Sequence, residues 1–287
     1  MNKIKIPDQH VGIIGPDERP IGVFLDMPEE KYFAVKAFSY SYSKEFAKSP
    51  AHGQAYLKKE HRIDPDREFF KAVHLLTMED RKEDIVIQDG TWTAKIKAEV
   101  IAPLKAKGKL VLKQDDYDSA LEVAASLKAN TKVKALLDIC HPEVSIFWTD
   151  HITGVYCKAR LDMVGEFNGE MVLADIKSFG DLHNERLMTW QVMDKFYHHQ
   201  MAFYSMAINA IWQKYPKHLR WIFCEDKPPF ANKVRGCPES LMNDGWTVMT
   251  KLLGQYKSCQ EFDSWPAFEE EDKDIEIEVK KVEEDFR

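Results

Sequence analysis

One dipeptide constrains the fold of this chain more than any other feature: Asn168-Gly169, which separates two runs rich in apolar and β-branched residues. An Asn-Gly pair in that setting is the strongest short-range signal for a two-residue β-hairpin turn, because both residues tolerate a positive φ. If Phe167 faces Glu170, the position numbers of every opposed pair add to 337. Asp162 then falls opposite Asp175, and their Cβ atoms are expected ~5 Å apart.

The same register extends the prediction in both directions. Arg160 falls opposite Lys177, on the face of the two aspartates, because side chains alternate with a period of two along a strand. The preceding turn reads as a four-residue loop over 151–154, which brings Glu143 opposite Asp162. We therefore expect three acidic side chains from three neighbouring strands to converge.

Such a convergence of acids points to chemistry, because like charges placed directly opposite each other destabilise a sheet. A divalent cation would remove the repulsion, since hard cations bind carboxylate oxygens. A lysine beside the acids could orient a water molecule or stabilise negative charge on a phosphate. The pattern therefore predicts metal-dependent hydrolysis of phosphodiesters. The alternative is an exposed hairpin face whose acids are only solvated.

The rest of the chain predicts an α/β fold with a mixed sheet. Further strands are expected over 144–148, 155–166, 171–176 and 220–225. Helices are expected from Lys44 with Ser43 as the N-cap, over 68–78, over 115–137 with a break near Asn130, over 187–215 and over 241–259. Residues 1–37 read as an irregular or short-stranded segment. We expect a single domain over 1–268 and an acidic C-terminal tail over 269–287.

The net charge of −7 does not exclude DNA binding, because the charge is unevenly distributed. Residues 269–287 carry ten acidic and four basic side chains, so the remainder of the chain is nearly neutral. Such a body is compatible with a local basic groove. In the tail, Ile275, Ile277 and Val279 alternate with acids, which predicts either an edge strand or a solvated tail.

The sequence also predicts several absences. The five cysteines form no CxxC pair, so neither a zinc knuckle nor a disulfide framework is expected. No apolar run approaches the ~20 residues of a membrane helix. The first residues lack the apolar stretch of a secretion signal. We expect a cytoplasmic protein of a bacterial host cell that does not contact the membrane.

Asp162 followed by Asp175-Ile176-Lys177 matches the D…(D/E)xK signature of the PD-(D/E)xK nuclease superfamily. From about Tyr40 to Pro266 the sequence resembles the RecE/RecB-type exonucleases, most of all the RecE-like enzymes of phages and prophages, which are related to lambda exonuclease. The segments that carry the resemblance are Ser49-Pro50-Ala51-His52, Ala72-Val73-His74, Glu143 ahead of Ile146-Phe147-Trp148, Cys157 to Asp162, Asp175 to Ser178, the QxxxY pair Gln200 and Tyr204, and Trp265-Pro266.

The resemblance implies a PD-(D/E)xK core, in which helices flank a central mixed sheet with a catalytic β-hairpin. The catalytic residues that it implies are Asp162, Asp175, Lys177 and Glu143. Two Mg²⁺ ions are expected roughly 4 Å apart, and Mn²⁺ could substitute. The expected ligands of one ion are His74, Asp162, Asp175 and the carbonyl of Ile176, and those of the other are mainly Glu143 and Asp162. The residues expected to border the site or contact DNA are Arg160, Ser178, Gln200 and Tyr204.

His198 and His199 are adjacent, so we expect them to point to different faces of a helix, to be unable to serve one site, and to be structural. Some relatives hold an iron–sulfur cluster on closely spaced cysteines near the C-terminus. Cys224, Cys237 and Cys259 are too scattered for that, so no cluster is expected.

The activity that the resemblance implies is Mg²⁺-dependent digestion of linear duplex DNA from its 5′ ends. The product would be a 3′ single strand, passed to a RecT-like single-strand annealing protein for recombination, and the enzyme would be a ring-shaped homo-oligomer. One alternative is an endonuclease of the restriction or repair type on the same core. Another is a catalytically inactive DNA-binding subunit, against which the intact Asp162, Asp175 and Lys177 argue.

Overall fold

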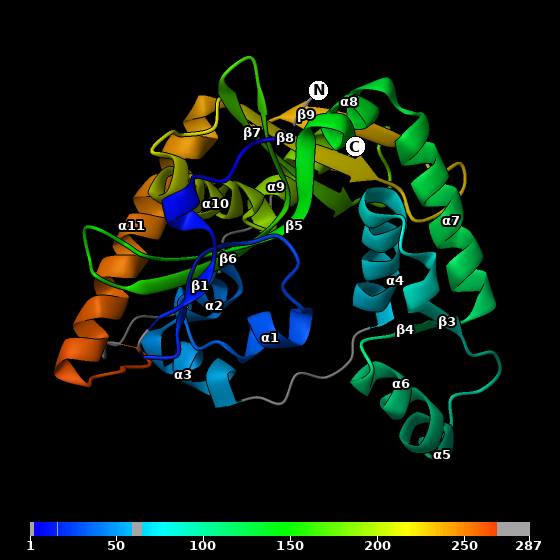
Figure 1. Ribbon diagram of the computed structural model, residues 1–287, viewed down its shortest axis with the longest axis horizontal. Helices are drawn as coiled ribbons and strands as arrows, with labels where there is room; N and C mark the ends of the chain where they lie inside the picture. Colours follow the sequence, from blue (N-terminus) through cyan, green and yellow to red (C-terminus); the bar gives the residue numbers. More distant parts are fainter. Residues whose placement is uncertain (1–2, 16, 59–64, 269–287) are drawn as a thin grey trace, which may run out of the picture.

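The structure is a computed structural model that describes residues 3–15, 17–58 and 65–268 (Figure 1). Its centre is a seven-stranded sheet with the order β1-β2-β5-β6-β7-β8-β9. The strands are β1 (Ile13–Ile14), β2 (Pro20–Phe24), β5 (Cys140–Thr149), β6 (Tyr156–Phe167), β7 (Glu170–Ser178), β8 (His218–Cys224) and β9 (Asn232–Gly236). Among these described strands only β7 and β8 pair in parallel, which confirms the expected α/β fold with a mixed sheet.

Helices and a small second sheet surround this core. The small sheet pairs β3 (Ile85–Ile87) with β4 (Leu110–Leu112) in parallel. The α-helices are α1 (Glu29–Ala34), α2 (Tyr40–Phe46), α3 (Pro50–Lys58), α4 (Pro65–His74), α5 (Ala94–Ile96), α6 (Ala102–Ala106), α7 (Gln114–Ala129), α8 (Thr131–Ile139), α9 (Glu185–Asp194), α10 (Tyr197–Trp212) and α11 (Glu239–Phe262). Short helical turns are η1 (Asp8–His10), η2 (Leu75–Glu79), η3 (Lys82–Asp84) and η4 (Lys97–Ile101). Within the described ranges, no helix is both long and apolar enough to cross a membrane.

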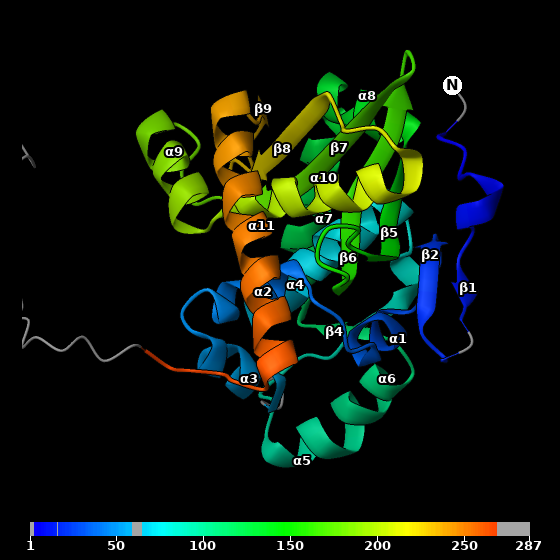
Figure 2. The ribbon, with the colours of Figure 1, turned by 90° about the vertical axis from the view of Figure 1, so that its left-hand side faces the viewer.

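The central sheet is covered by helices on both faces. Alternate residues of β7 enter two different hydrophobic cores: Leu173 packs in the core with α2, α10 and α11, whereas Ala174 packs in the core with α4, α7 and α8. Figure 2 shows α10 and α11 in front of the sheet, with α7 and α4 behind it. Because both faces are buried, β7 reads in the sequence as a nearly continuous apolar run, and its buried acid is therefore conspicuous.

The predicted register is confirmed along the β5–β6 ladder, and for the β6–β7 hairpin it is confirmed next to the turn. Phe167 pairs with Glu170, and the β6–β7 ladder continues in that register to Met163 and Ala174. Asn168 and Gly169 have φ values of 51° and 82°, as a type I′ turn requires. The β5–β6 ladder likewise keeps the expected register from Cys140↔Gly165 to Thr149↔Tyr156.

Two helix predictions are wrong. In the first, a different residue caps the helix; in the second, contacts with a residue distant in sequence interrupt it. The N-cap of α2 is Ser39, whose hydroxyl accepts from the Tyr42 amide, while Ser43 is buried inside the helix. The helix expected over 187–215 is two helices, α9 and α10, separated at Phe196, which has a φ of 56°. The break at Asn130 is confirmed. The edge strand expected around Ile275 lies outside the described residues.

Candidate active site

The sheet splits where the expected catalytic residues lie. The β6–β7 ladder ends at Met163 and Ala174, one pair before Asp162 and Asp175. Beyond that point β7 stays paired with β8 as far as Ser178, while β6 stays paired with β5. Because β6 remains hydrogen-bonded to β5 and β7 remains hydrogen-bonded to β8, the two strands separate from each other at this point. The expected ladder pair between Asp162 and Asp175 therefore does not form.

The split also corrects the expected pairing of Arg160 with Lys177. Arg160 pairs with Ser145 on β5, and Lys177 pairs with Phe223 on β8. In place of a ladder bond, the Ile176 amide donates to Asp162 Oδ2 at 2.9 Å. The amide and carbonyl of one strand residue point to the same edge, so the Ile176 carbonyl faces this opening too.

Glu143 occupies a strained position on β5. It lies between the ladder pairs Pro142↔Met163 and Val144↔Leu161, opposite Asp162, and its φ is 49°. L-residues rarely adopt such a φ, and those that do are concentrated at functional sites. The backbone at Glu143 therefore departs from the regular ladder at the level of Asp162.

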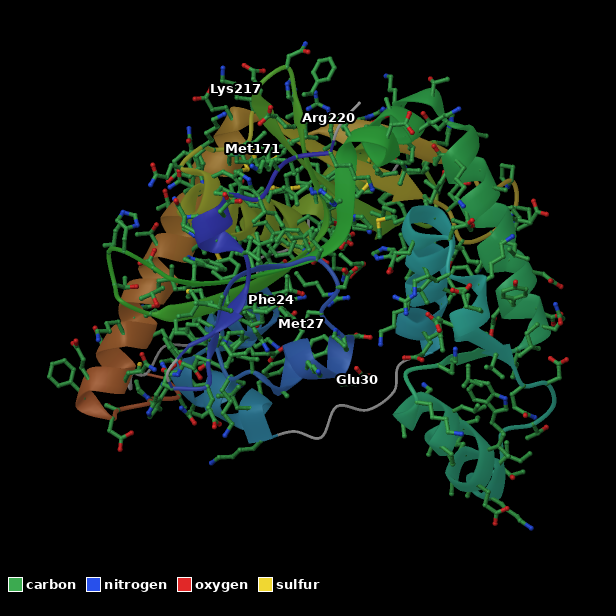
Figure 3. The ribbon with its side chains drawn as sticks, viewed as in Figure 1. Phe24, Met27, Glu30, Met171, Lys217 and Arg220 are labelled. Carbon is green, nitrogen blue, oxygen red and sulfur yellow. The ribbon has the colours of Figure 1, made fainter. Side chains whose placement is uncertain are left out.

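Arg160 holds the Glu143 side chain in place. Its Nε donates to Glu143 Oε2 at 2.6 Å, and its Nη1 donates to the carbonyl of Met27 at 2.8 Å and to Ser145 Oγ at 3.2 Å. Met27, labelled in Figure 3, lies just before α1. Since these contacts use the guanidinium inside the protein, Arg160 is better placed to position Glu143 than to contact DNA.

His74, the last residue of α4, reaches the same carboxylates from a helix. Its Nδ1 lies 3.3 Å from Glu143 Oε1, and its Nε2 lies 3.7 Å from Asp162 Oδ2. The three side chains each place a ligand atom within 4.8 Å of the others, as a single metal ion requires. Ala72 and Val73, just before the histidine, are fully buried and anchor this turn of α4 in the core.

Asp175 and Lys177 form a buried ion pair beside this group. Asp175 is only 1% exposed, and Lys177 Nζ pairs with its Oδ2. Asp175 Oδ1 has no hydrogen-bond partner among the described atoms. Buried carboxylate oxygens are normally satisfied, so this one is suited to a ligand such as a metal ion. Lys177 Nζ also lies 4.9 Å from the centre of the Tyr197 ring.

The pKa values show an excess of negative charge at the opening. Burial, together with the charge of Asp175, raises the pKa of Asp162 to about 7. Burial alone would lower the pKa of His74, but the charges of Asp162 and Glu143 outweigh it and raise that pKa to about 9. Burial would raise the pKa of Glu143, but His74 and Arg160 outweigh it and lower that pKa to about 2. Without metal, the site therefore retains protons that a cation can displace.

The QxxxY pair borders the site from α10. Gln200 Nε2 donates to the Tyr204 hydroxyl at 2.9 Å. Burial raises the pKa of Tyr204, and the charge of Asp175 adds to the shift, which places the phenol within the field of the carboxylates. Ser178 ends β7, and its carbonyl accepts from Gln191 Nε2 at 2.9 Å.

Two tyrosines near the Asp175–Lys177 pair were not predicted. Tyr197, whose ring lies beside the Lys177 ammonium, could have been suspected from its place one turn before Gln200 on the same helix. Tyr40 donates from its hydroxyl to the carbonyls of Lys195 at 3.0 Å and Phe196 at 2.9 Å, and so fixes the chain just before α10. No local pattern signals that contact, because Tyr40 is 155 residues away from Lys195.

The interpretation of the two adjacent histidines requires correction. His198 Nε2 lies 2.9 Å and His199 Nε2 lies 3.4 Å from Asp244 Oδ2, so both rings meet the same carboxylate. Adjacent helix positions differ by about 100° around the axis. The two imidazoles span that angle because α11 crosses over this end of α10.

The donors at the opening suit a hard divalent cation such as Mg²⁺ or Mn²⁺, with an imidazole among carboxylate oxygens. His74 lies with Glu143 and Asp162, whereas Asp175 is paired with Lys177. This grouping differs from the expected set of ligands for the first ion, in which His74 shares its metal with Asp175. The division of the side chains between two ions stays a prediction.

Comparisons with known proteins agree with this geometry. The family model described as "PDDEXK-like domain of unknown function (DUF3799)" matches residues 39–273. A crystal structure from Eubacterium rectale, named "Putative exonuclease", is similar with a TM-score of 0.56 and 14% identity, over 81% of this chain and 87% of that chain. At that identity the likeness concerns the fold alone. The structure of SSO0001 has a TM-score of 0.30 and 13% identity, over 75% of this chain and 84% of that chain, which is too weak to support an argument. No curated protein sequence matches the chain.

Proposed function

This chain belongs to the family of PDDEXK-like domains, and from that premise we propose that it is a metal-dependent deoxyribonuclease. The observation that carries the proposal is the set of donors at the split between β6 and β7. His74, Glu143 and Asp162 place ligand atoms within 4.8 Å of one another, next to the buried Asp175–Lys177 pair. A purely structural role does not explain why acids gather there, because their repulsion destabilises the sheet.

In this proposal each side chain at the opening has a separate role. A divalent cation bound here would activate a water molecule and neutralise charge on the phosphate. Asp162 on β6 and Glu143 on the neighbouring β5 both offer carboxylate oxygens to the cation, and Arg160 keeps Glu143 in position. The site is thus arranged to hold both a cation and the reacting phosphate.

Lys177 acts as a donor in this scheme. Burial would lower its pKa, but the charges of Asp175 and Asp162 outweigh burial and raise it. The side chain therefore stays protonated at neutral pH, and it can hold the attacking water or stabilise the charge of the transition state. Because it is protonated, Lys177 is not the base that takes a proton from the attacking water. A divalent cation held by His74, Glu143 and Asp162 would instead lower the pKa of that water, so that solvent could accept its proton.

The finer proposal is a 5′-to-3′ exonuclease that uses Mg²⁺, digests one strand of linear duplex DNA and leaves a 3′ single strand. It rests on the resemblance to RecE-like enzymes. The same resemblance supports a ring-shaped homo-oligomer and delivery of the product to a single-strand annealing protein. Light scattering of the full chain, alone and with DNA, tests the ring: a monomer under both conditions would contradict it.

One assay separates the rival functions. Linear duplex DNA with its 5′ and 3′ ends labelled separately, and closed circular duplex, are incubated with Mg²⁺, Mn²⁺, Ca²⁺ or EDTA. We expect early release of the 5′ label with Mg²⁺ or Mn²⁺, and an intact circle. Cutting of the circle would indicate an endonuclease, and early release of the 3′ label would reverse the polarity. If the wild-type chain leaves all DNA intact with each metal, as an Asp175→Asn variant should, the chain is an inactive binding subunit.

A further inference from the structure

A second group of possible metal ligands lies between α10 and α11, separate from the carboxylates of the sheet. It consists of His198 and His199 at the start of α10 and Asp244 near the start of α11. Their ligand atoms lie within 4.8 Å of one another, and the two imidazole Nε2 atoms are 2.9 Å and 3.4 Å from Asp244 Oδ2. Two ligands that are each about 2.0 Å from a tetrahedral zinc ion lie about 3.3 Å apart. The observed separations are close to that value.

The packing of the two helices is adapted to bring the acid to the histidines. Figure 2 shows α11 crossing α10. A Cβ atom on Gly245, next to Asp244, would lie only 2.7 Å from the carbonyl oxygen of His198 and 2.9 Å from Ala202 Cβ. The crossing is therefore so close that only glycine fits there. This close approach is what places the Asp244 carboxylate over the start of α10.

The imidazoles are also held by their surroundings. His198 is 1% exposed, and its ring centre lies 4.3 Å from that of His199. Phe196 stacks on the His199 ring with centres 5.0 Å apart and an interplanar angle of 20°. Asp244 has a more exposed side chain, which leaves an approach from solvent. Two fixed rings and one accessible carboxylate form a three-ligand site with a position left for water.

We propose that His198, His199 and Asp244 bind a transition-metal ion of the zinc class. The two imidazole nitrogens indicate which metal would bind: imidazole nitrogen favours Zn²⁺, Ni²⁺ or Co²⁺, whereas Mg²⁺ prefers oxygen donors. The ion would tie α10 to α11 immediately after Tyr197, whose ring lies against Lys177. The site is therefore a brace for the helix that borders the catalytic lysine, and it does not depend on the proposed nuclease activity.

The competing explanation is a plain hydrogen bond from His198 to Asp244 that joins the two helices. Asp244→Asn separates the two explanations, because an amide keeps a hydrogen-bonding group of the same shape but loses the anionic ligand. His199→Ala removes a second ligand. His151→Ala, at an exposed histidine of the β5–β6 loop, is the matched control for loss of an imidazole.

The probe is Zn²⁺ alone, titrated calorimetrically into metal-free full-length protein that carries Asp162→Asn, which weakens binding at the sheet. We expect one zinc ion to bind, with affinity at least about tenfold weaker after Asp244→Asn or His199→Ala and unchanged after His151→Ala. Co²⁺ should give the visible absorption of a tetrahedral site, and Mg²⁺ should not displace it. Equal zinc affinity with and without Asp244→Asn, or no zinc binding at all in the Asp162→Asn protein, would overturn the proposal. Neither result would bear on DNA cleavage.

Discussion

Asp162 Oδ2 accepts a 2.9 Å hydrogen bond from the backbone amide of Ile176, at the point where the ladder between their two strands has ended. The carboxylate thus replaces a main-chain partner, and the opening between β6 and β7 leaves that amide satisfied. The strands that border the opening are buried on both faces. The candidate ligands therefore rest on rigid elements, as a metal site requires.

Substitution of the two aspartates should separate chemistry from stability. We expect Asp162→Asn and Asp175→Asn each to lower the cleavage rate at least about 100-fold, because each removes several kcal/mol of metal-dependent stabilisation. Without metal, Asp162→Asn should be as stable as the wild type or more stable, because the amide oxygen can still accept from Ile176 while the repulsion is relieved. Asp175→Asn should be less stable, because Lys177 loses its buried partner.

End-labelled cleavage assays and thermal melts in EDTA measure the two effects. Mn²⁺ titration of each variant reports on ligand loss independently of activity. If Asp162→Asn melts well below the wild type in EDTA, repulsion between the carboxylates is not a destabilising feature of the metal-free protein.

Removal of the lysine should stop cleavage without abolishing metal binding. Lys177→Ala leaves Asp175 buried without its ion-pair partner, so we expect a loss of roughly 3–5 kcal/mol in metal-free stability. Metal should restore part of this loss, because a cation compensates the carboxylate. Lys217→Ala is the control: this exposed lysine, labelled in Figure 3, lies 2.6 Å from Glu170, and its loss should change stability little because solvent screens an exposed ion pair. A Lys177→Ala protein that cuts DNA at the wild-type rate would refute the role given to the lysine.

The stability of the metal-free protein should fall as the pH rises. The folded-state pKa of Asp162 is raised from 3.8 to about 7, and that of His74 from 6.5 to about 9. In both cases the folded protein holds a proton that the unfolded chain has released, so higher pH favours unfolding. Stability from His74 is fully present below pH 6.5 and is lost by about pH 9. We expect a decrease on the order of 3 kcal/mol over that interval.

Urea unfolding in EDTA at several pH values tests this prediction. His74→Gln should flatten most of the decrease, and saturating Mg²⁺ should also reduce it, because the cation replaces the protons. Metal affinity should rise over the same interval. A free energy of unfolding that is constant or increasing from pH 6.5 to 9 in EDTA would contradict the pKa shifts.

The hairpin could be predicted from the sequence because its determinants are local. Asn168-Gly169 sets the turn, and alternation sets the faces, so the registers of β5, β6 and β7 followed directly. The split that opens the site could not be predicted. It depends on the pairing of β7 with β8, some forty residues later in the chain, and on the φ of 49° at Glu143. Counting positions along a regular ladder predicts neither the pairing of β7 with β8 nor the unusual backbone at Glu143.

The same distinction explains the error over α9 and α10. Helical periodicity continues through Phe196, and no glycine or proline near this position marks a break. The break is instead stabilised by Tyr40, whose hydroxyl donates hydrogen bonds to the carbonyls of Lys195 and Phe196. A contact between such distant residues leaves no trace in a local pattern. The position of His199 near Asp244 was missed for the same reason.

The acidic tail over 269–287 lies outside the described residues, but its charge supports a prediction. It carries ten acidic and four basic side chains, and none of the proposed metal ligands lies in it. Deletion of the tail should therefore leave cleavage chemistry intact. It should tighten non-specific DNA binding at low salt, because the removal of net negative charge weakens repulsion from phosphates.

Binding of the full chain and of the truncated chain should be compared across a salt series in Ca²⁺, which we expect to occupy the site without supporting cleavage. The difference between the two forms should shrink as salt screens the tail, with a screening length of about 10 Å at 0.1 M ionic strength. A chain in which the tail acids are replaced by their amides is the matched control, because it removes charge and keeps length. If truncation weakens binding while the amide variant tightens it, the tail contributes contacts to DNA or to a neighbouring subunit. If both changes weaken binding, repulsion by the tail is the wrong explanation.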